Sequence, residues 1–465
     1  RQIEHQVEGS GERSNQSTRL WLRAPAAEIS GRLTKNGIDL TGVRRLEATI
    51  ENKEVKALDV AGLPVRTTVV GTTAARGTET VHAEAPRLLQ IGPQSLRLLG
   101  ASGPDASSLW HDLPGPNALP SLDVAVSPPR APAKRFALTG PCIDVHHLGS
   151  SAVFVDATAS DGLRPAVNAT FEHKSGAPTT ASFDAARLRL LPFAVTREAQ
   201  QMHTGAASSV LADLAFHALG KPWVIVDEVR NFRLQDEQHG LIEGQGTRLL
   251  LSQGAEAGVF FGDPELGTPA EVRRTEDGRV ITTRGARVRV FREQDVRLQA
   301  LRTFDGRPTV LLPTVTLHEP GRKGPLSHLR AVCRGDIEVL PASVVCRGPV
   351  EAQGLREDGS DDPDGVHFDA ENLRMERQAE KGEIVRALCD NAKMDWSGMS
   401  ATTRSLELDL KLSRLIARDA KGAVVALPNG RTLTAPRIEV NYETWSFDLH
   451  HGGFTQKNPT QGHGR

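Results

Sequence analysis

Histidine and aspartate clusters are the first residues in this sequence whose types could support metal chemistry. Two adjacent histidines follow an acidic residue in DVHH at 144–147 and again in DLHH at 448–451. Neighbouring side chains on a strand point to opposite faces, so neither pair could chelate a metal ion without ligands from other strands. The pattern favours surface histidines at strand ends over a metal site.

One acidic segment resembles a calcium-binding loop. In SDDPDGVHFDAE at 360–371, Asp362, Asp364, Gly365 and Glu371 occupy the third, fifth, sixth and twelfth places of such a loop. The first ligand position is Ser360, however, and no helical pattern flanks the segment. Because residues 366–375 have the alternation of a strand, we expect an acidic hairpin turn here.

Motifs for other kinds of catalysis are weak or missing. The sequence has no G-x-S-x-G elbow, Walker loop, H-E-x-x-H or C-x-x-C pair. EGQGTRLL at 243–250 lacks the third glycine and the helix of a nucleotide fingerprint. A carbohydrate-acting β-helix enzyme would need a row of carboxylates and aromatic rings, and only Asp395-Trp396 and Trp445 offer one. The sequence therefore predicts a protein that is not an enzyme and has no cofactor.

The cysteines leave two alternatives open. Cys333 and Cys346 lie in two strand-like pieces on either side of a turn that contains proline. They could form a disulfide in an oxidising compartment, or they could be small buried thiols within strands.

Charge and composition argue against several partners. The 56 basic and 57 acidic residues nearly cancel, so no strong field would attract nucleic acid or an anionic membrane. Aromatic residues make up only 4% of the chain, which argues against base-stacking platforms and sugar-binding clefts. No apolar run approaches the roughly 18–20 residues of a membrane-spanning helix. We expect membrane contact only through partners or through a segment that precedes residue 1.

The elements that must position these residues are mostly strands. RSLELDLKLSRL at 404–415 and RGARVRVF at 284–291 alternate apolar and charged residues, so each has one dry and one wet face. Only EAQQMHTGAASSVLADLAFHALGKPW, from residue 198, has helical spacing, and it predicts one helical insert around 198–220.

A repeated phrase organises most of the chain. In each copy, a small residue comes shortly before an apolar-x-apolar strand, and the later copies recur about every 32 residues. A single hairpin cannot bury its dry face, so stacked copies must share one apolar interior. The repeat predicts an all-β fold of stacked antiparallel jelly-roll or β-solenoid repeats. The small residues are Ala85, Gly140, Ala185, Gly246, Gly285, Ala370, Thr403 and Ala435, with Ala24 and Gly335 as looser members.

Composition shifts divide the chain into five predicted segments. These are an N-terminal β-repeat module, a Pro-rich linker, a β-repeat module with the helical insert, a third β-repeat module and a flexible tail, at 1–102, 103–134, 135–325, 326–451 and 452–465.

The dry strand faces suggest a binding groove. If large side chains do not fill the interior of the stacked units, it forms a long apolar groove suited to acyl chains, whereas a filled interior is an ordinary core. Both interpretations apply to every candidate lining residue: Leu249, Leu251, Val288, Val290, Leu373, Met375, Leu406, Leu408, Leu410, Ile438 and Val440.

The repeat resembles a known family. GVHFDAENLRMERQAEKGEIVRALCDNAKMDW at 365–396, APRIEVNYETWSFDLHHGG at 435–453 and VFFGDPELGTPAEVRRTEDGRVITTRGARVRVF at 259–291 resemble the OstA-like family of lipopolysaccharide-transport proteins. The family comprises periplasmic bridge proteins and the N-terminal domain of the outer-membrane translocon. The resemblance is best over residues 240–450 and includes the module at 326–451.

This resemblance implies a partly open β jelly roll that holds lipid acyl chains and stacks end to end with like domains through edge strands. It implies no catalytic residue. We therefore expect a non-enzymatic conduit for lipopolysaccharide or another acylated lipid, in the periplasm or cell envelope of a Gram-negative-type bacterium. The alternative is a structural or adhesive cell-surface β-repeat protein with a solid core.

Overall fold

The protein is all-β. The computed structural model describes residues 2–8, 17–23, 29–33, 38–51, 54–73, 77–92, 95–100, 119–127, 134–146, 154–160, 162–171, 178–190, 223–237, 240–252, 257–292, 295–304, 307–321, 324–378, 384–451 and 453–456. These residues contain strands and turns but no helix, and therefore no helix that could span a membrane. The helical insert expected around 198–220 lies outside the described residues.

The chain divides into two compact units, with the boundary around β16. The first unit comprises residues 1–238 and 243–255. Its strands are β1 (Gln2–Glu8), β2 (Ser17–Arg23), β3 (Ile29–Leu33), β4 (Ile38–Glu51), β5 (Glu54–Thr73), β6 (Gly77–Gly92), β7 (Ser95–Leu99), β8 (Ser121–Ser127), β9 (Lys134–Thr139), β10 (Cys142–His146), β11 (Phe154–Thr158), β12 (Ala166–Phe171), β13 (Thr179–Asp184), β14 (Arg187–Leu190), β15 (Trp223–Asp236) and most of β16 (Gly240–Ser252).

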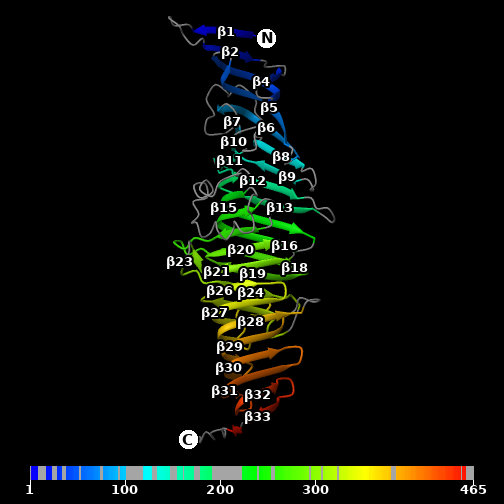
Figure 1. Ribbon diagram of the computed structural model, residues 1–465, viewed down its shortest axis with the longest axis vertical. Coiled ribbons are helices and arrows are strands. Elements are labelled where there is room, and N and C mark those ends of the chain that lie inside the picture. The colour runs from blue at the N-terminus through cyan, green and yellow to red at the C-terminus, as the bar shows by residue number, and fades with distance from the viewer. Residues whose placement is uncertain are drawn as a thin grey trace, which may run out of the picture. The chain divides into compact units, whose positions relative to one another are not determined.

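The second unit, residues 239–242 and 256–465, continues the same antiparallel pattern (Figure 1). Its strands are β17 (Ala257–Phe261), β18 (Ala270–Glu276), β19 (Arg279–Gly285), β20 (Arg287–Arg292), β21 (Val296–Leu301), β22 (Thr303–Phe304), β23 (Arg307–Pro308), β24 (Thr314–His318), β25 (His328–Cys333), β26 (Asp336–Val339), β27 (Ser343–Gly354), β28 (His367–Arg377), β29 (Ile384–Trp396), β30 (Met399–Asp409), β31 (Arg414–Ala426), β32 (Arg431–Asn441), β33 (Ser446–His450) and β34 (Gly453–Gln456).

Two walls of strands form the second unit. The first wall contains β17, β20, β21, β26, β33 and one half of each strand from β27 to β32. The second wall contains β18, β19, β24, β25, β34 and the other halves. The walls meet at a corner, where the chain passes from one to the other, and their hairpin turns lie on the opposite side, which we call the seam. Of the two architectures predicted from the sequence, the jelly roll describes this antiparallel arrangement.

The small residues of the sequence repeat mark the corner. The strand register breaks directly after Ala370 in β28, Thr403 in β30 and Ala435 in β32, and the strand then continues in the first wall. All three are at most 8% exposed. Gly285 stands at the same place as the last residue of β19, just before β20, and Gly335 lies between β25 and β26. The spacing of the repeat is therefore the spacing of the corners.

The first unit has corners of the same kind. Ala85 lies at the register break of β6, and Ala185 separates β13 from β14. Both side chains are at most 1% exposed. Because β6 and β15 bend at the corner, they close a ten-strand ring with the shorter strands between them: β6, β7, β10, β11, β14, β15, β13, β12, β9 and β8.

Each wall has the dry and wet faces expected from the alternation of its residues. On the outer face of the first wall, charged side chains pair across neighbouring strands. Arg386 Nη1 lies 3.5 Å from Glu376 Oε2, and Arg418 Nη1 lies 3.1 Å from Glu407 Oε2. Exposed pairs of this kind contribute little stability individually, but opposite charges on adjacent strands favour the observed register.

The segment boundaries differ from those predicted. β8 lies inside the expected linker 103–134 and pairs with both β6 and β9, so this part of the linker belongs to the sheet. No boundary falls at 325/326, because β24 and β25 on either side of it form a hairpin. β34 lies within the expected tail 452–465 and pairs with β32. Turn-rich composition marked hairpin turns here rather than breaks between modules.

The close approach of two strands at the corner predicts that position 335 requires glycine. A Cβ atom on Gly335 would lie 1.8 Å from the carbonyl oxygen of Arg347, so Gly335→Ala must shift one of two paired strands. We expect the free energy of unfolding to fall by roughly 1–3 kcal/mol in urea titrations. Gly92→Ala is the control, because its Cβ would meet Ser95 at an ordinary 3.5 Å. Equal stability of the two variants would contradict a crowded corner.

Candidate functional site

Except for Leu410, the predicted groove residues of the second unit fall on two ladders of directly paired residues in the first wall. Val288, Leu373, Leu406 and Ile438 belong to one ladder. Its full course is Phe260, Val288, Ala300, Ile337, Cys346, Leu373, Cys389, Leu406, Ala417, Ile438 and Leu449. Sequence alternation thus selected residues that the fold aligns along one face.

Val290, Met375, Leu408 and Val440 belong to the second ladder, one pleat closer to the seam. It runs through Gly258, Val290, Leu298, Val339, Val344, Met375, Ala387, Leu408, Leu415, Val440 and Phe447. The second wall has a corresponding inner ladder of Val272, Thr283, Val315, Ala331, Ala352, Phe368, Met394, Ala401, Val425 and Leu433.

These inner faces are filled rather than open. Leu408, Val440 and Phe368 are 0% exposed, and the most exposed of the predicted groove residues within strands is Leu251, at 7%. Leu249 and Leu251 lie on β16, where the intervening Leu250 is buried as well. In this structure the two walls bury each other's inner faces, and most of these side chains have almost no contact with solvent.

Leu410 differs from the other candidates. It lies just beyond the end of β30, is only half-buried, and lines a cavity at the seam instead of the interior. Its amide nitrogen donates a hydrogen bond to Val385 O, at 2.9 Å, within the first wall.

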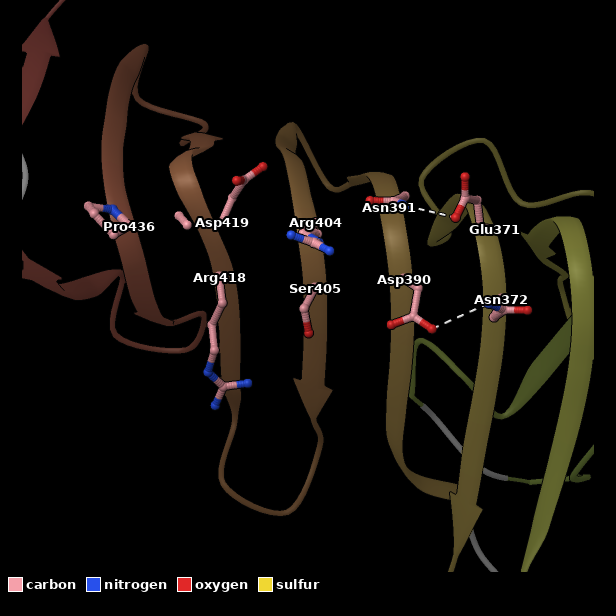
Figure 2. Close-up of a pocket in the computed structure, with 10 residues that line it drawn as sticks. Glu371, Asn372, Asp390, Asn391, Arg404, Ser405, Arg418, Asp419 and Pro436 are labelled. Carbon is pink, nitrogen blue, oxygen red and sulfur yellow. Dashed lines mark hydrogen bonds between the residues drawn. The ribbon is translucent and has the colours of Figure 1, made fainter.

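Polar side chains line a shallow groove of about 640 Å³ on the outside of the corner (Figure 2). Asn391 Nδ2 donates to Glu371 Oε2 at 2.6 Å, and Asn372 Nδ2 donates to Asp390 Oδ2 at 3.4 Å. Asn391 has a positive φ of 46°, which asparagine tolerates better than most residues. These groups mainly satisfy one another, so the groove is a structural part of the corner. Glu371 lies here, away from the turn that holds Asp362 and Asp364.

A larger cavity, of about 880 Å³, lies at the seam. The turns of the first wall contribute Leu410, Tyr442 and Trp445, and the second wall contributes Trp396 and Glu319. The rings of Trp396 and Tyr442 meet edge to face, with centroids 4.9 Å apart. Sequence reasoning noted Trp396 and Trp445 but did not place them together, and it missed Tyr442. The only tyrosine in the chain was the available signal.

Comparison of the chain with models of known protein families, with curated proteins and with solved structures finds no match. The geometry of the walls, the corner and the seam is therefore the basis for any functional conclusion. Within the described ranges, no group of three or more histidine, cysteine, aspartate or glutamate side chains could hold a metal ion.

Of the two alternatives for Cys333 and Cys346, the structure has free, buried thiols rather than a disulfide. Cys333 ends β25 in the second wall and pairs with Val350, whereas Cys346 lies across the corner in the first wall and pairs with Ile337 and Leu373. Both residues are therefore small buried thiols that pack within their strands. Burial raises the pKa of the Cys346 thiol well above its usual range and that of Cys389 to about 12.

Thiol labelling tests this arrangement. We expect Cys346 and Cys389 of the native protein to resist Ellman's reagent at pH 8, because both thiols are protonated and inaccessible. All four cysteines should react once the protein is unfolded in guanidinium. Rapid labelling of either residue in the native state, or a Cys333–Cys346 bond in the non-reduced peptide map, would contradict the packed interior.

Proposed function

We propose that this chain is a non-enzymatic periplasmic conduit that binds amphipathic, lipopolysaccharide-like lipid between the two walls of its jelly roll. The observation that carries the proposal is the pair of apolar inner faces that continue from β17 to the last strands of the second unit without a charged residue on the ladders described above. Acyl chains require an apolar environment of this length and continuity.

The way the walls are joined supports the same proposal. At the corner the backbone itself passes from wall to wall, whereas near the seam the described backbone hydrogen bonds connect strands of one wall. Leu410 N donates to Val385 O in the first wall, and Leu427 N donates to Arg431 O in the second. The walls can therefore separate along the seam without loss of these hydrogen bonds.

Buried charges span part of the seam. Arg377, at the end of β28 in the first wall, interacts electrostatically with Arg274, Glu276, Arg279 and Glu319 of the second wall. Burial, followed by the neighbouring guanidinium of Arg274, lowers the pKa of Arg377. Arg274 Nη2 is 2.9 Å from Glu276 Oε2, and its Nε has no hydrogen-bond partner among the residues that the structure describes. Removing these charged groups from water costs free energy. They therefore hold the two walls together less strongly than apolar contacts at the same place would.

The filled interior sets a condition on the function. An acyl chain can enter only if the walls move apart and side-chain contacts such as those of Leu408 and Phe368 are exchanged for contacts with lipid. Such an exchange keeps apolar surface away from water, so its cost is much smaller than that of exposing the interior.

The same observation favours a second candidate function. Side chains that are 0% exposed on both walls are what a solid core requires. A structural or adhesive β-repeat protein of the cell surface would use the ladders only for rigidity. The two candidates differ in one measurable property, which is whether the native protein carries lipid.

The proposed partners are like β-jelly-roll domains that add to a sheet edge. Phe447 and Leu449 of β33 continue the two inner ladders but are half-buried, whereas Val440 and Ile438 beside them are fully buried. A strand from another domain that paired with β33 would extend the ladders and cover both side chains.

Lipid extraction followed by mass spectrometry tests the proposal. We expect the detergent-free protein, purified from its own envelope, to carry acylated lipid. Leu408→Asp should abolish this cargo, because it places a charge on the inner face, whereas Leu412→Asp should retain it, since Leu412 is 54% exposed. Circular dichroism must show the same β spectrum for both variants.

Ala387→Leu provides a second interior variant if Leu408→Asp fails to fold. It adds apolar volume beside Leu408 without charge and should reduce lipid capture. A wild-type protein that is free of lipid and takes up no added lipopolysaccharide would overturn the conduit and favour the solid-core alternative.

A further inference from the structure

The tryptophan and tyrosine side chains of the second unit line the seam cavity. The chain has five tryptophans and one tyrosine, and two of these tryptophans and the tyrosine line this single cavity. The low aromatic content argued against a sugar-binding cleft when the sequence was considered as a whole. The fold changes that argument, because it brings Trp396, Tyr442 and Trp445 together from turns about 50 residues apart in the sequence.

Hydrogen bonds fix the backbone of the turn that carries Tyr442 and Trp445. Trp445 is 39% exposed and has a φ of 52° in the turn between β32 and β33. In that turn Asn441 Oδ1 accepts hydrogen bonds from Glu443 N at 3.1 Å and Thr444 N at 2.9 Å. Tyr442 N donates to Ser413 O at 3.1 Å, which ties the turn to the neighbouring hairpin. A turn whose backbone is ordered before a ligand arrives loses little entropy on binding.

Polar groups of mixed character complete the cavity. Glu443 Oε1 accepts from Ser413 Oγ at 2.6 Å, which orients its carboxylate. Gln378 and Lys411 add amide and ammonium donors to the lining, and Glu319, only 8% exposed, lies 4.0 Å from Arg279 Nε. Both hydrogen-bond donors and acceptors therefore surround the aromatic rings.

This composition distinguishes between classes of ligand. A nucleotide would also stack on the rings, but its phosphates would meet two glutamates and one lysine among the lining residues. A purely apolar ligand would leave these polar groups desolvated and unpaired. A neutral pyranose has an apolar C–H face for an aromatic ring and hydroxyl groups for carboxylate, amide and ammonium partners.

We propose that the seam cavity binds a neutral pyranose oligosaccharide, with one ring stacked on Trp445 and its hydroxyl groups directed to Glu443, Gln378 and Lys411. The cavity volume of about 880 Å³ lies within the usual range of small-molecule sites, roughly 300–1,000 Å³. The sugar could belong to a free oligosaccharide or to the headgroup of a glycolipid. The proposal goes beyond the conduit function, because it requires no space in the interior.

Tryptophan fluorescence and calorimetric titration test this site in the full chain. The probes are maltotriose, cellotriose, chitotriose and mannotriose as free glycans, and intact lipopolysaccharide as the glycolipid. We expect at least one probe to bind. Trp445→Asn should weaken that binding by roughly tenfold or more, through loss of the stacked face. Asparagine is chosen because it accepts the positive φ of this position.

Val310→Ala is the matched control, because Val310 is 80% exposed and does not line the cavity. Gln378→Ala should also weaken binding and provides a second test if Trp445→Asn does not fold. Binding of free glycans identifies an oligosaccharide site, and Trp445-dependent binding of lipopolysaccharide alone identifies a glycolipid headgroup.

Absence of binding to every probe at about 10 mM, or binding that Trp445→Asn and Gln378→Ala leave unchanged, would overturn the saccharide site. This result is independent of lipid extraction, since a lipid-free protein could still bind glycans and a lipid-loaded one could fail to.

Discussion

The crowded corner is the constraint on which the rest of the structure depends. A Cβ atom on Gly335 would lie 1.8 Å from Arg347 O, and β28, β30 and β32 each place a small buried residue at the corner: Ala370, Thr403 and Ala435. These positions restrict the register of the strands in both walls at once, because a slip of one residue would reverse the faces of both halves. The apolar ladders and the outer ion pairs follow from that register.

The sequence was sufficient to predict the all-β class and the alignment of the inner faces. Alternation around Leu406 and Leu408 identifies a dry face, and the small residue before each strand identifies where a unit begins. The meaning of that small residue was not evident, because a local pattern does not show that the strand bends there. The predicted boundary at 325/326 falls inside the β24–β25 hairpin for a similar reason, since a hairpin turn and a linker have the same composition.

The seam could not be predicted from local patterns. Trp396 lies in a different hairpin from Tyr442 and Trp445, and their meeting depends on the register of the strands between them. The sequence also could not show whether the interior is filled. Filling depends on the distance between the two walls rather than on the identity of residues such as Val288. A resemblance to lipid-binding jelly rolls favours an open interior, whereas the burial of Leu408 and Phe368 describes a closed one. A single fold accommodates both descriptions if the walls separate at the seam.

The direction of the chain at successive corners has a consequence for how such a protein can change in length. β28 passes from the second wall to the first, and β29 returns. One sequence repeat therefore contains an outward and a return crossing, and it ends with the chain in the same wall and direction in which it began. Duplication or loss of a whole repeat would lengthen or shorten the unit while both end strands keep their partners. Evolution by whole-repeat steps is thus compatible with this fold, whereas insertion of a single crossing would reverse every strand that follows.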